Sequence, residues 1–223
     1  MISVIIPVLN EASTVGPSLR RLRETCGAAE IVVVDGGSDD GTPAIAGRYA
    51  TVTDAPRGRA AQMNRGAQLA QGDTLLFLHV DALLDCAWSA AVLAAVDSGA
   101  VAGTFVQRID ASGVAYRVIE RAANLRARRL SLFYGDAGVF VTRDAFERVG
   151  GFPQVEIGEE FGFSRAVRAL GATVVVDSTV LVSPRRWERR GIARVTLTNW
   201  LIALLLHARV PPARVARLYD VVR

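Results

Sequence analysis

Short runs of apolar, β-branched residues alternate with stretches rich in alanine and arginine over the first hundred residues, and this alternation limits the fold more than any other feature. Uninterrupted apolar runs are typical of strands buried on both faces, and alternating strands and helices are typical of a parallel sheet covered on both sides. We expect an α/β fold, an open and mostly parallel sheet that binds ligands at the carboxyl ends of its strands. The strands are predicted at Ser3–Val8, Ile31–Val34, Thr51–Asp54 and Thr74–Leu78, and the helices at Ser13–Cys26, Pro43–Tyr49, Arg59–Ala70 and Ala87–Asp97.

The order of the elements changes after about Gly99. The 223 residues contain neither an internal repeat nor a low-complexity linker, so we expect one domain over 1–223, with halves at 1–100 and 101–190 and a tail at 191–223. In the second half, strands are predicted at Val101–Ile109, Ala137–Thr142, Thr173–Val176 and Val180–Val182, and helices at Ala115–Arg129, Arg143–Val149 and Glu159–Leu170.

The positive charge of the chain is concentrated in its tail. All 26 basic residues are arginine, and from Arg185 to the end nine arginines face two acids, a net charge of +7 within a total of +4. Arginine is a planar fork suited to phosphate and carboxylate. Such a block is usually a solvated face, but beside apolar sequence it can also mark contact with an anionic membrane surface. We expect no nucleic-acid partner.

An apolar stretch, Ile192–Val210, lies within the basic tail and is interrupted by arginines and by His207. A membrane span needs roughly 20 apolar residues, so this stretch is too short. Four of its residues share one helical face: Leu197, Leu201, Leu204 and Ala208. The spacing predicts an amphipathic helix that either packs on the body of the protein or makes peripheral membrane contact through 192–217.

The cysteines and the N-terminus indicate the compartment. Cys26 and Cys86 are far apart and lack metal-ligand spacing, which favours reduced thiols in the cytoplasm. The opening residues MISVIIPVLNE have no basic segment and are typical of a strand rather than a signal peptide. We expect a cytoplasmic protein that associates with the inner face of the membrane through its tail.

The turn after the second predicted strand, DGGSDDGT, carries three carboxylates and no base. Carboxylates repel phosphate but accept hydrogen bonds from ribose hydroxyls and base N–H groups. Asp35 directly follows the apolar run and is therefore predicted to bind a nucleoside. Asp39, Asp40 and Thr42 are expected to cap and start the next helix.

A second aspartate, Asp81, follows the strand at Thr74–Leu78 and is expected close to Asp35. Mg2+ and Mn2+ bind one or two protein carboxylates and complete their coordination with diphosphate oxygens and water. Asp81 is therefore a candidate metal ligand. His79 lies two positions earlier and is expected to pack or to form a hydrogen bond instead.

Two arginines flank Gly58 at the start of a predicted helix. Guanidinium groups and free helical N–H groups attract phosphate, which makes Arg57 and Arg59 candidate diphosphate ligands. A surface helix that merely begins with arginine is the alternative.

Taken in order, six segments resemble the motifs of family 2 glycosyltransferases with the GT-A fold, and the likeness is strongest to the small bacterial branch of radical-SAM/selenodomain-associated transferases. The resemblance covers essentially the whole chain. The segments are PVLNE at 7–11, VVDGGSDDGT at 33–42, RGRAAQMNRGAQLAQGD at 57–73, FLHVDALL at 77–84, YGDAGVFVTRDAFERVGGF at 134–152 and RRWERRG at 185–191.

The resemblance implies a nucleoside-diphosphate-sugar donor, Mn2+ or Mg2+, and transfer with inversion. Asp81 matches the last acid of the family's metal motif, whose first aspartate is replaced by His79. The catalytic base of the family, most often in a Glu-Asp pair, matches Glu159 and Glu160. The nucleoside-contacting residues match Pro7, Asn10, Glu11 and Asp35.

The basic tail supplies three more candidates. Arg185 or Arg186 is expected to fold back onto the diphosphate. Trp187 is expected either to stack on the sugar or acceptor or to pack inside the protein. The resemblance further implies a nucleotide-sugar-binding half at 1–100 and an acceptor and catalytic half at 101–190, and the arginines favour a lipid-linked or phosphorylated hydroxyl acceptor.

Three other classes of protein were compared with the sequence, and the first of them remains open. A non-catalytic nucleotide-sugar or carbohydrate-binding protein on the same scaffold would account for the Glu-Glu pair and for His79. A sugar-phosphate nucleotidyltransferase would carry a glycine-rich basic loop where PVLNEAST stands, and a Rossmann dehydrogenase would carry GxGxxG there. Neither motif is present, which argues against both classes.

Overall fold

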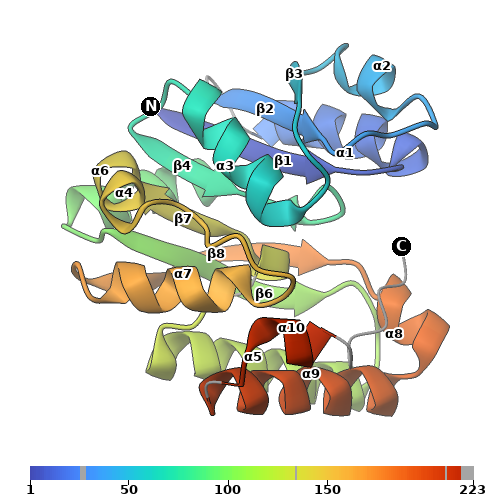
Figure 1. Ribbon diagram of the computed structural model, residues 1–223, viewed down its shortest axis with the longest axis vertical. Helices are drawn as coiled ribbons and strands as arrows, with labels where there is room; N and C mark the ends of the chain where they lie inside the picture. The colour runs from blue at the N-terminus through green and yellow to red at the C-terminus, as the bar shows by residue number, and fades with distance from the viewer. Residues whose placement is uncertain (26–28, 134, 209, 217–223) are drawn as a thin grey trace.

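The computed structural model describes residues 1–25, 29–133, 135–208 and 210–216. Cys26, Tyr134, Arg209 and residues 217–223 lie outside these ranges, so the predicted tail at 191–223 is described only in part. Figure 1 shows the N-terminal half of the chain above the C-terminal half, with their strands joined in one sheet.

The first half contains the predicted alternation of strands and helices. A two-residue strand, β5, was not predicted; it follows β4 and precedes α4. The elements are β1 (Ile2–Val8), α1 (Ala12–Thr25), β2 (Glu30–Asp35), α2 (Thr42–Ala46), β3 (Thr51–Asp54), α3 (Arg59–Leu69), β4 (Thr74–Phe77), β5 (Leu83–Leu84) and α4 (Trp88–Asp97).

The second half differs from prediction mainly in one strand. Two strands were expected at Thr173–Val176 and Val180–Val182, whereas the structure has the single strand β8, because Asp85 accepts hydrogen bonds from the polar residues between them. The elements are β6 (Ala102–Ile109), α5 (Val114–Leu130), a 3-10 turn η1 (Gly135–Ala137), β7 (Val139–Thr142), α6 (Arg143–Val149), α7 (Glu159–Arg168), β8 (Thr173–Val182), α8 (Arg185–Arg190), α9 (Ile192–His207) and α10 (Pro212–Ala216).

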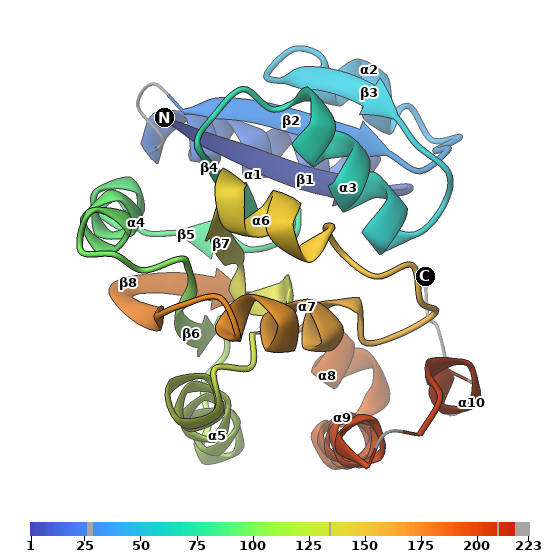
Figure 2. The same ribbon diagram turned by 60° about the vertical axis from the view of Figure 1, so that its left-hand side comes forward.

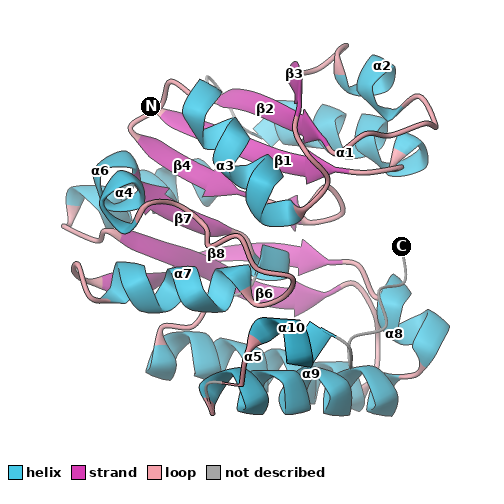
Figure 3. Ribbon diagram, in the orientation of Figure 1, coloured by secondary structure: helices cyan, strands magenta, loops and turns pink. Residues whose placement is uncertain are grey.

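The strands form an eight-stranded mixed sheet in the order β3-β2-β1-β4-β7-β6-β8-β5. β7 runs antiparallel to both of its neighbours and β5 antiparallel to β8, while the other pairs are parallel. Figure 3 shows the strands lying between helices on either side. The predicted α/β class with a mostly parallel sheet is confirmed.

Alternate residues of β1 enter separate cores on the two faces of the sheet, as the period of a strand requires. Val4 and Ile6 pack with α1 and α4, whereas Ile5 packs with α3, α6 and α7. Each core thus joins elements of both halves. The prediction of helices on both faces is confirmed, and Figure 2 shows them from a second direction.

Helix α9 packs through a different face from the one that its leucines indicated. Val195, Ile202 and Leu206 are buried, whereas Leu197 and Leu204 are 64% and 66% exposed. The expectation that the leucine face docks on the body is therefore wrong. Among the helices of the described ranges, none has both the length and the apolar character needed to cross a membrane.

Gly66 allows α3 to approach the sheet closely. A Cβ at this position would lie 2.4 Å from Ile5 Cγ2 and 3.0 Å from Val34 Cγ2. The two side chains belong to adjacent buried strands and have little room to move. The close approach sets the distance between α3 and the strands β1 and β2.

Gly66→Ala is expected to destabilise the protein by about 1–3 kcal/mol, because the added methyl overpacks this contact. Helix propensity alone predicts the opposite sign, since alanine is better than glycine inside a helix by about 1 kcal/mol. Urea unfolding measures the difference. Gln68→Ala, on the exposed side of the same helix, is the control and should change little; a Gly66→Ala variant as stable as the wild type would contradict the packing argument.

Candidate active site

Asp35 and Asp81 lie at the same edge of the sheet. Asp35 is the last residue of β2 and pairs with Val8 at the end of β1. On the other side of β1, β4 ends at Phe77, and the chain reaches Asp81 in the following turn. The structure therefore brings the two aspartates to one edge, as the sequence predicted.

Asp35 holds its own turn together. Its Oδ2 accepts hydrogen bonds from the N–H groups of Gly37 (2.9 Å) and Ser38 (2.8 Å), and its Oδ1 accepts one from Ser38 Oγ. A carboxylate has about four acceptor positions, so at least one remains for a ligand. The carboxylate is thus a structural part of the turn, and it is 6% exposed.

The PVLNE segment is fixed to this turn. Asn10 has a left-handed backbone (φ 54°); its N–H donates to Ser38 Oγ (2.9 Å), and its Oδ1 accepts from the N–H of Asp39 (3.0 Å). Pro7 lies within β1, and the N–H of Glu11 donates to Thr42 Oγ1 (2.8 Å). The predicted nucleoside-contacting residues are therefore assembled around one rigid turn.

Asp40 supports two helices instead of one. It accepts from Thr42 N–H (3.0 Å) at the start of α2, as expected, and also from Ala12 N–H (2.9 Å) at the start of α1. These bonds, with the Thr42 hydroxyl as the largest cause, lower the pKa of Asp40 below its usual value. Asp40 therefore serves structure, and the expectation that it caps only the next helix was incomplete.

Two amide side chains of α3 were not identified from the sequence. The Nε2 of Gln62 donates to the carbonyl oxygens of Val8 and Val34, both at 2.8 Å. Asn64 forms a pair of hydrogen bonds with the backbone of Phe152, at 2.9 and 2.8 Å. The sequence gives one indication of these roles: in the segment QMN, the polar residues Gln62 and Asn64 lie on the apolar side of the predicted helix.

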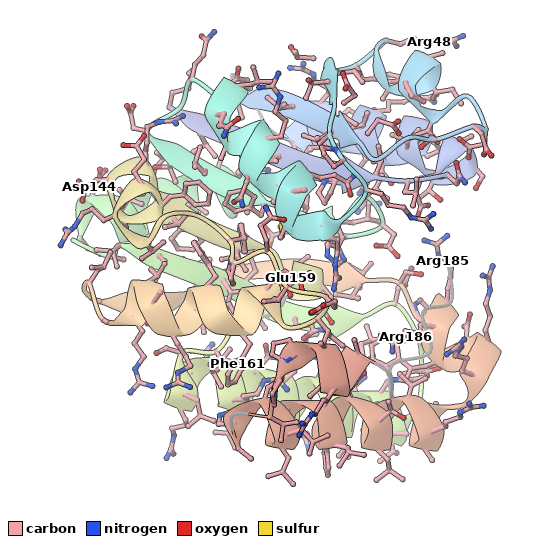
Figure 4. The ribbon with its side chains drawn as sticks, in the orientation of Figure 1. Arg48, Asp144, Glu159, Phe161, Arg185 and Arg186 are labelled. Carbon is pink, nitrogen blue, oxygen red and sulfur yellow. The ribbon has the colours of Figure 1, made fainter. Side chains whose placement is uncertain are left out.

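Arg59 lies beside the two carboxylates that the resemblance assigned to the catalytic base. Its Nε is 2.8 Å from Glu159 Oε1 and its Nη1 is 3.8 Å from Glu160 Oε1. Glu159 and Glu160 are only 3% and 6% exposed, and Figure 4 shows Glu159 in the middle of the molecule, between the two halves. Buried carboxylates need a cation, so Arg59 is committed to them. The role of Arg59 as a phosphate ligand stays a prediction, as does that of the exposed Arg57.

Burial and mutual repulsion change the proton affinity of this pair. The pKa of Glu159 is raised from 4.5 to about 6, first because burial disfavours its charge and then because of the negative charge of Glu160; Arg59 opposes both. Glu159 therefore takes up a proton in a mildly acidic solution.

His79 lies next to Glu160. A Cβ on Gly135 would be 2.9 Å from His79 Nε2 and 2.5 Å from Glu160 Oε1, so both atoms face this glycine. Burial, with the charge of Arg59 as the second cause, lowers the pKa of His79 and keeps the ring neutral. Its Nε2 is buried and has no hydrogen-bond partner within the described ranges. His79 was expected to pack or to form a hydrogen bond, and the buried Nε2 beside Gly135 agrees with the packing alternative.

Arg185 folds back onto the site, as was expected of either Arg185 or Arg186. Its Nη2 is 2.9 Å from Asp81 Oδ2, and Figure 4 shows it at the side of the molecule near the junction of the two halves. Asp81 remains 33% exposed. Arg186 follows in α8 and is partly buried.

Trp187 does not present a stacking surface to a ligand. Its side chain is 8% exposed, and its ring packs edge-on against Tyr116 at 6.3 Å. The stacking role is therefore wrong, because α8 turns this ring into the core; the packing alternative is correct.

The carboxylates do not form a preassembled metal centre. Within the described ranges, no group of three or more His, Cys, Asp or Glu side chains is arranged to hold a metal ion. Asp81 is a single partly exposed carboxylate. A metal here would need most of its ligands from a substrate and from water.

Comparison with known proteins points to one family. The family model "Glycosyl transferase family 2" matches residues 3–151. A PGL/p-HBAD biosynthesis glycosyltransferase of Mycobacterium tuberculosis is 38% identical over 136 residues, which cover 56% of this chain and 50% of that protein. Glycosyltransferase AglD of Haloferax volcanii is 30% identical over 234 residues, covering 91% of this chain and 35% of that protein. The chain thus spans half or less of the length of these two relatives.

Solved structures share the fold. A mannosyltransferase from Pyrobaculum calidifontis, in complex with GDP-Man and Mn2+, superposes with a TM-score of 0.72 at 21% identity, covering 97% of this chain and 68% of that one. TarS 1–349 of S. aureus has a TM-score of 0.62 at 16% identity, with coverages of 97% and 68%. The similarity extends over nearly the whole chain, including residues beyond the match to the family model.

Glu159→Gln is expected to change how stability depends on pH. The folded protein holds the proton of Glu159 more tightly than the unfolded chain, so the stability from this group is complete below pH 4.5 and is lost as the pH rises through about 6. From pH 4.5 to pH 7, the free energy of unfolding of the wild type should fall relative to that of Glu159→Gln by about 2 kcal/mol.

Urea unfolding of both proteins at several pH values measures this difference. Glu156→Gln, an exposed site on the same segment, is the control and should keep the wild-type dependence. Parallel curves for the wild type and Glu159→Gln would show that the raised pKa is wrong.

Proposed function

The chain belongs to glycosyltransferase family 2, and from that membership we propose that it is an inverting glycosyltransferase, which moves a sugar from a nucleoside-diphosphate-sugar to an acceptor hydroxyl. The observation that carries the proposal is the buried Glu159–Glu160 pair, held by Arg59 between the two halves and facing the strand edge that bears Asp35 and Asp81. Chemistry of this kind needs a nucleotide subsite, a diphosphate subsite and a base within one cleft.

The donor nucleoside would bind at the turn of Asp35, with Pro7, Asn10 and Glu11 beside it. The hydrogen bonds within this turn fix the remaining acceptor position of Asp35 in advance, which lowers the ordering cost of binding. The carboxylates of this turn repel phosphate, so the diphosphate would lie farther along the edge, near Asp81, Arg57 and Arg185.

The residues at this edge fit a divalent metal, Mn2+ or Mg2+, held by Asp81 and by donor diphosphate oxygens. A single accessible carboxylate, next to a neutral His79 with an unbonded Nε2, suits a hard cation that takes most of its ligands from substrate and water. When bound, such an ion supplies Lewis-acid stabilisation of the charge on the leaving diphosphate. Arg185, already beside Asp81, would add a charge-assisted hydrogen bond to that diphosphate.

Glu160 is the better candidate for the base. Glu159 is bound closely by Arg59, whereas Glu160 is farther from that guanidinium and its Oε1 lies against Gly135, beside His79 Nε2. In the proposed reaction, the oxygen of the acceptor hydroxyl attacks the anomeric carbon, and a carboxylate oxygen of Glu160 takes the proton of that hydroxyl. The bond from that carbon to the diphosphate breaks on the opposite face, so the centre inverts.

Other parts of the proposal concern the acceptor, the location and the branch. A lipid-linked or phosphorylated acceptor at the cytoplasmic face of the membrane would suit the arginine-rich tail. The division into 1–100, 101–190 and 191–223 and the likeness to the radical-SAM/selenodomain-associated branch remain predictions.

A non-catalytic binding protein on the same scaffold is the second candidate. Two features favour it: the Glu-Glu pair, where an aspartate is usual at position 160, and His79 in place of an aspartate in the metal motif. Such a protein would bind nucleotide-sugars without turnover.

Glu160→Gln is expected to slow the release of nucleoside diphosphate from the donor by a factor on the order of 10^2–10^4, because general-base catalysis is lost. The donor is first found by a thermal-shift screen of nucleotide-sugars, since a ligand of the folded state raises the melting temperature. Release is then measured without acceptor, where water replaces the hydroxyl, with Mn2+ or with a chelator.

Glu160→Asp keeps a carboxylate and should remain active, and Glu156→Gln should match the wild type. Binding of a donor without turnover by the wild type and by Glu160→Asp would instead favour the binding protein. Turnover unaffected by Glu160→Gln would remove Glu160 from the mechanism.

A further inference from the structure

Exposed apolar side chains are concentrated on two helices. Of the eleven large hydrophobic side chains that are exposed within the described ranges, eight lie on α5 and α9. They are Val114, Val118, Leu125 and Leu130 on α5, and Leu197, Trp200, Leu201 and Leu204 on α9. Scattered exposed apolar residues are ordinary, whereas a concentration of this kind marks an interaction surface.

These two helices lie at the same end of the molecule. Figures 1 and 2 both show α5 and α9 in one layer at the bottom of the molecule, farthest from β1, β2 and β3. On α5, Val114, Val118 and Leu125 follow the spacing of one helical stripe. On α9, Leu197, Leu201 and Leu204 do the same. We call the exposed sides of α5 and α9 the base face.

The charges on the base face have a single sign. The only acidic residue of α5, Glu120, is 3% exposed and is turned inward, where it accepts from the N–H of Ile109 (2.6 Å) and pairs with Arg117 (2.9 Å). Helix α9 contains no acidic residue. Arg121 and Arg128 are exposed on α5, and Arg121 continues the stripe of Val114 and Val118. The outer surface of both helices therefore offers apolar groups and cations together.

A hollow lies beside α5. It has a volume of about 250 Å3 and opens between the end of β6 and the helix. Three arginines, Arg108, Arg117 and Arg121, border it together with Glu120, which pairs with Arg108 (3.5 Å) and Arg117 (2.9 Å). Arg121 thus belongs both to this hollow and to the base face.

We propose that the base face docks the protein on an anionic lipid bilayer, with the apolar stripes of α5 and α9 in the interface and the arginines on the lipid headgroups. A bilayer of this composition offers acyl chains and negative charge to the same surface, which matches both features. A second copy of the chain is a poorer occupant, because a symmetric contact between two base faces would bring the arginines of both copies into one interface.

The docking surface goes beyond the proposed activity and does not depend on it. The base face and the site are connected along the chain. Helix α8 ends immediately before α9, and the first residue of α8, Arg185, contacts Asp81 in the site.

Flotation with vesicles tests the proposal on the full chain. The wild type should float with phosphatidylcholine vesicles that contain about one third phosphatidylglycerol, less in high salt, and not with phosphatidylcholine alone. Two double variants, Val118→Glu with Leu125→Glu and Leu197→Glu with Leu204→Glu, should each weaken binding by a factor on the order of ten or more.

Leu69→Glu and Leu93→Glu are the matched controls, because both leucines are exposed (38% and 42%) but lie on α3 and α4, away from the base face. They should float like the wild type. Circular dichroism and melting curves check that every variant is folded, which is expected since all the altered side chains are exposed. Acceptor-free turnover of the donor should be equal in all of them, so a failure of docking is distinguishable from a failure of the proposed function.

Three results would overturn the proposal: no binding of the wild type to anionic vesicles, equal binding of the base-face variants and the controls, or loss of binding only for the α9 variant. The last would limit the surface to α9. A concentration-dependent dimer in light scattering, abolished by the base-face variants and found without vesicle binding, would assign the face to a second copy instead.

Discussion

The side-chain amide of Gln62 donates to the carbonyl oxygens of Val8 and Val34, at the point where β1 and β2 end. The carbonyl of Val8 also accepts from the N–H of Gly36 (3.0 Å), so the amide of Gln62 adds a second bond there and ties the ends of β1 and β2 to α3. Helix α3 supplies these bonds, and it also holds Phe152 through Asn64 and the carboxylate pair through Arg59. One helix thus fixes the nucleotide edge, the loop that leads to α7 and the candidate base relative to one another.

The charge distribution follows from burial. Glu159 and Glu160 begin α7 inside the protein, where two carboxylates repel each other, and Arg59 offsets the cost of keeping them charged. A negative charge at the start of a helix is also favoured by the helix dipole. The same arrangement places Glu160 against Gly135 and His79, where the proposed base would act. Asp81, more exposed and bound only at its edge by Arg185, is suited to exchange partners when a substrate arrives.

The sequence was sufficient for the features that depend on local pattern. Apolar runs predicted the strands, and parallel strands must end at the same edge, so Asp35 and Asp81 were placed correctly. Features that depend on tertiary partners were not predictable. Arg59 binds carboxylates a hundred residues away in the sequence. Gln62 donates hydrogen bonds to two strands, and the hydrophobic pattern of the sequence does not show that these strands are neighbours. For α9 the sequence left open whether the leucine face packs on the body or contacts a membrane, because leucine spacing shows that a stripe exists and not which side the protein covers. Trp187 was ambiguous for the same reason.

The central claim is that one cleft between the two halves holds a nucleotide-sugar with its nucleoside at Asp35 and its sugar toward Glu160. A crystal structure of the Glu160→Gln variant with Mn2+ and the donor found by screening tests it most directly, since a variant without turnover keeps the donor intact. The account predicts the nucleoside on the Asp35 turn, the diphosphate between Asp81 and Arg185, and the anomeric carbon on the side of position 160. A donor bound elsewhere, or one whose sugar faces away from α7, would contradict it.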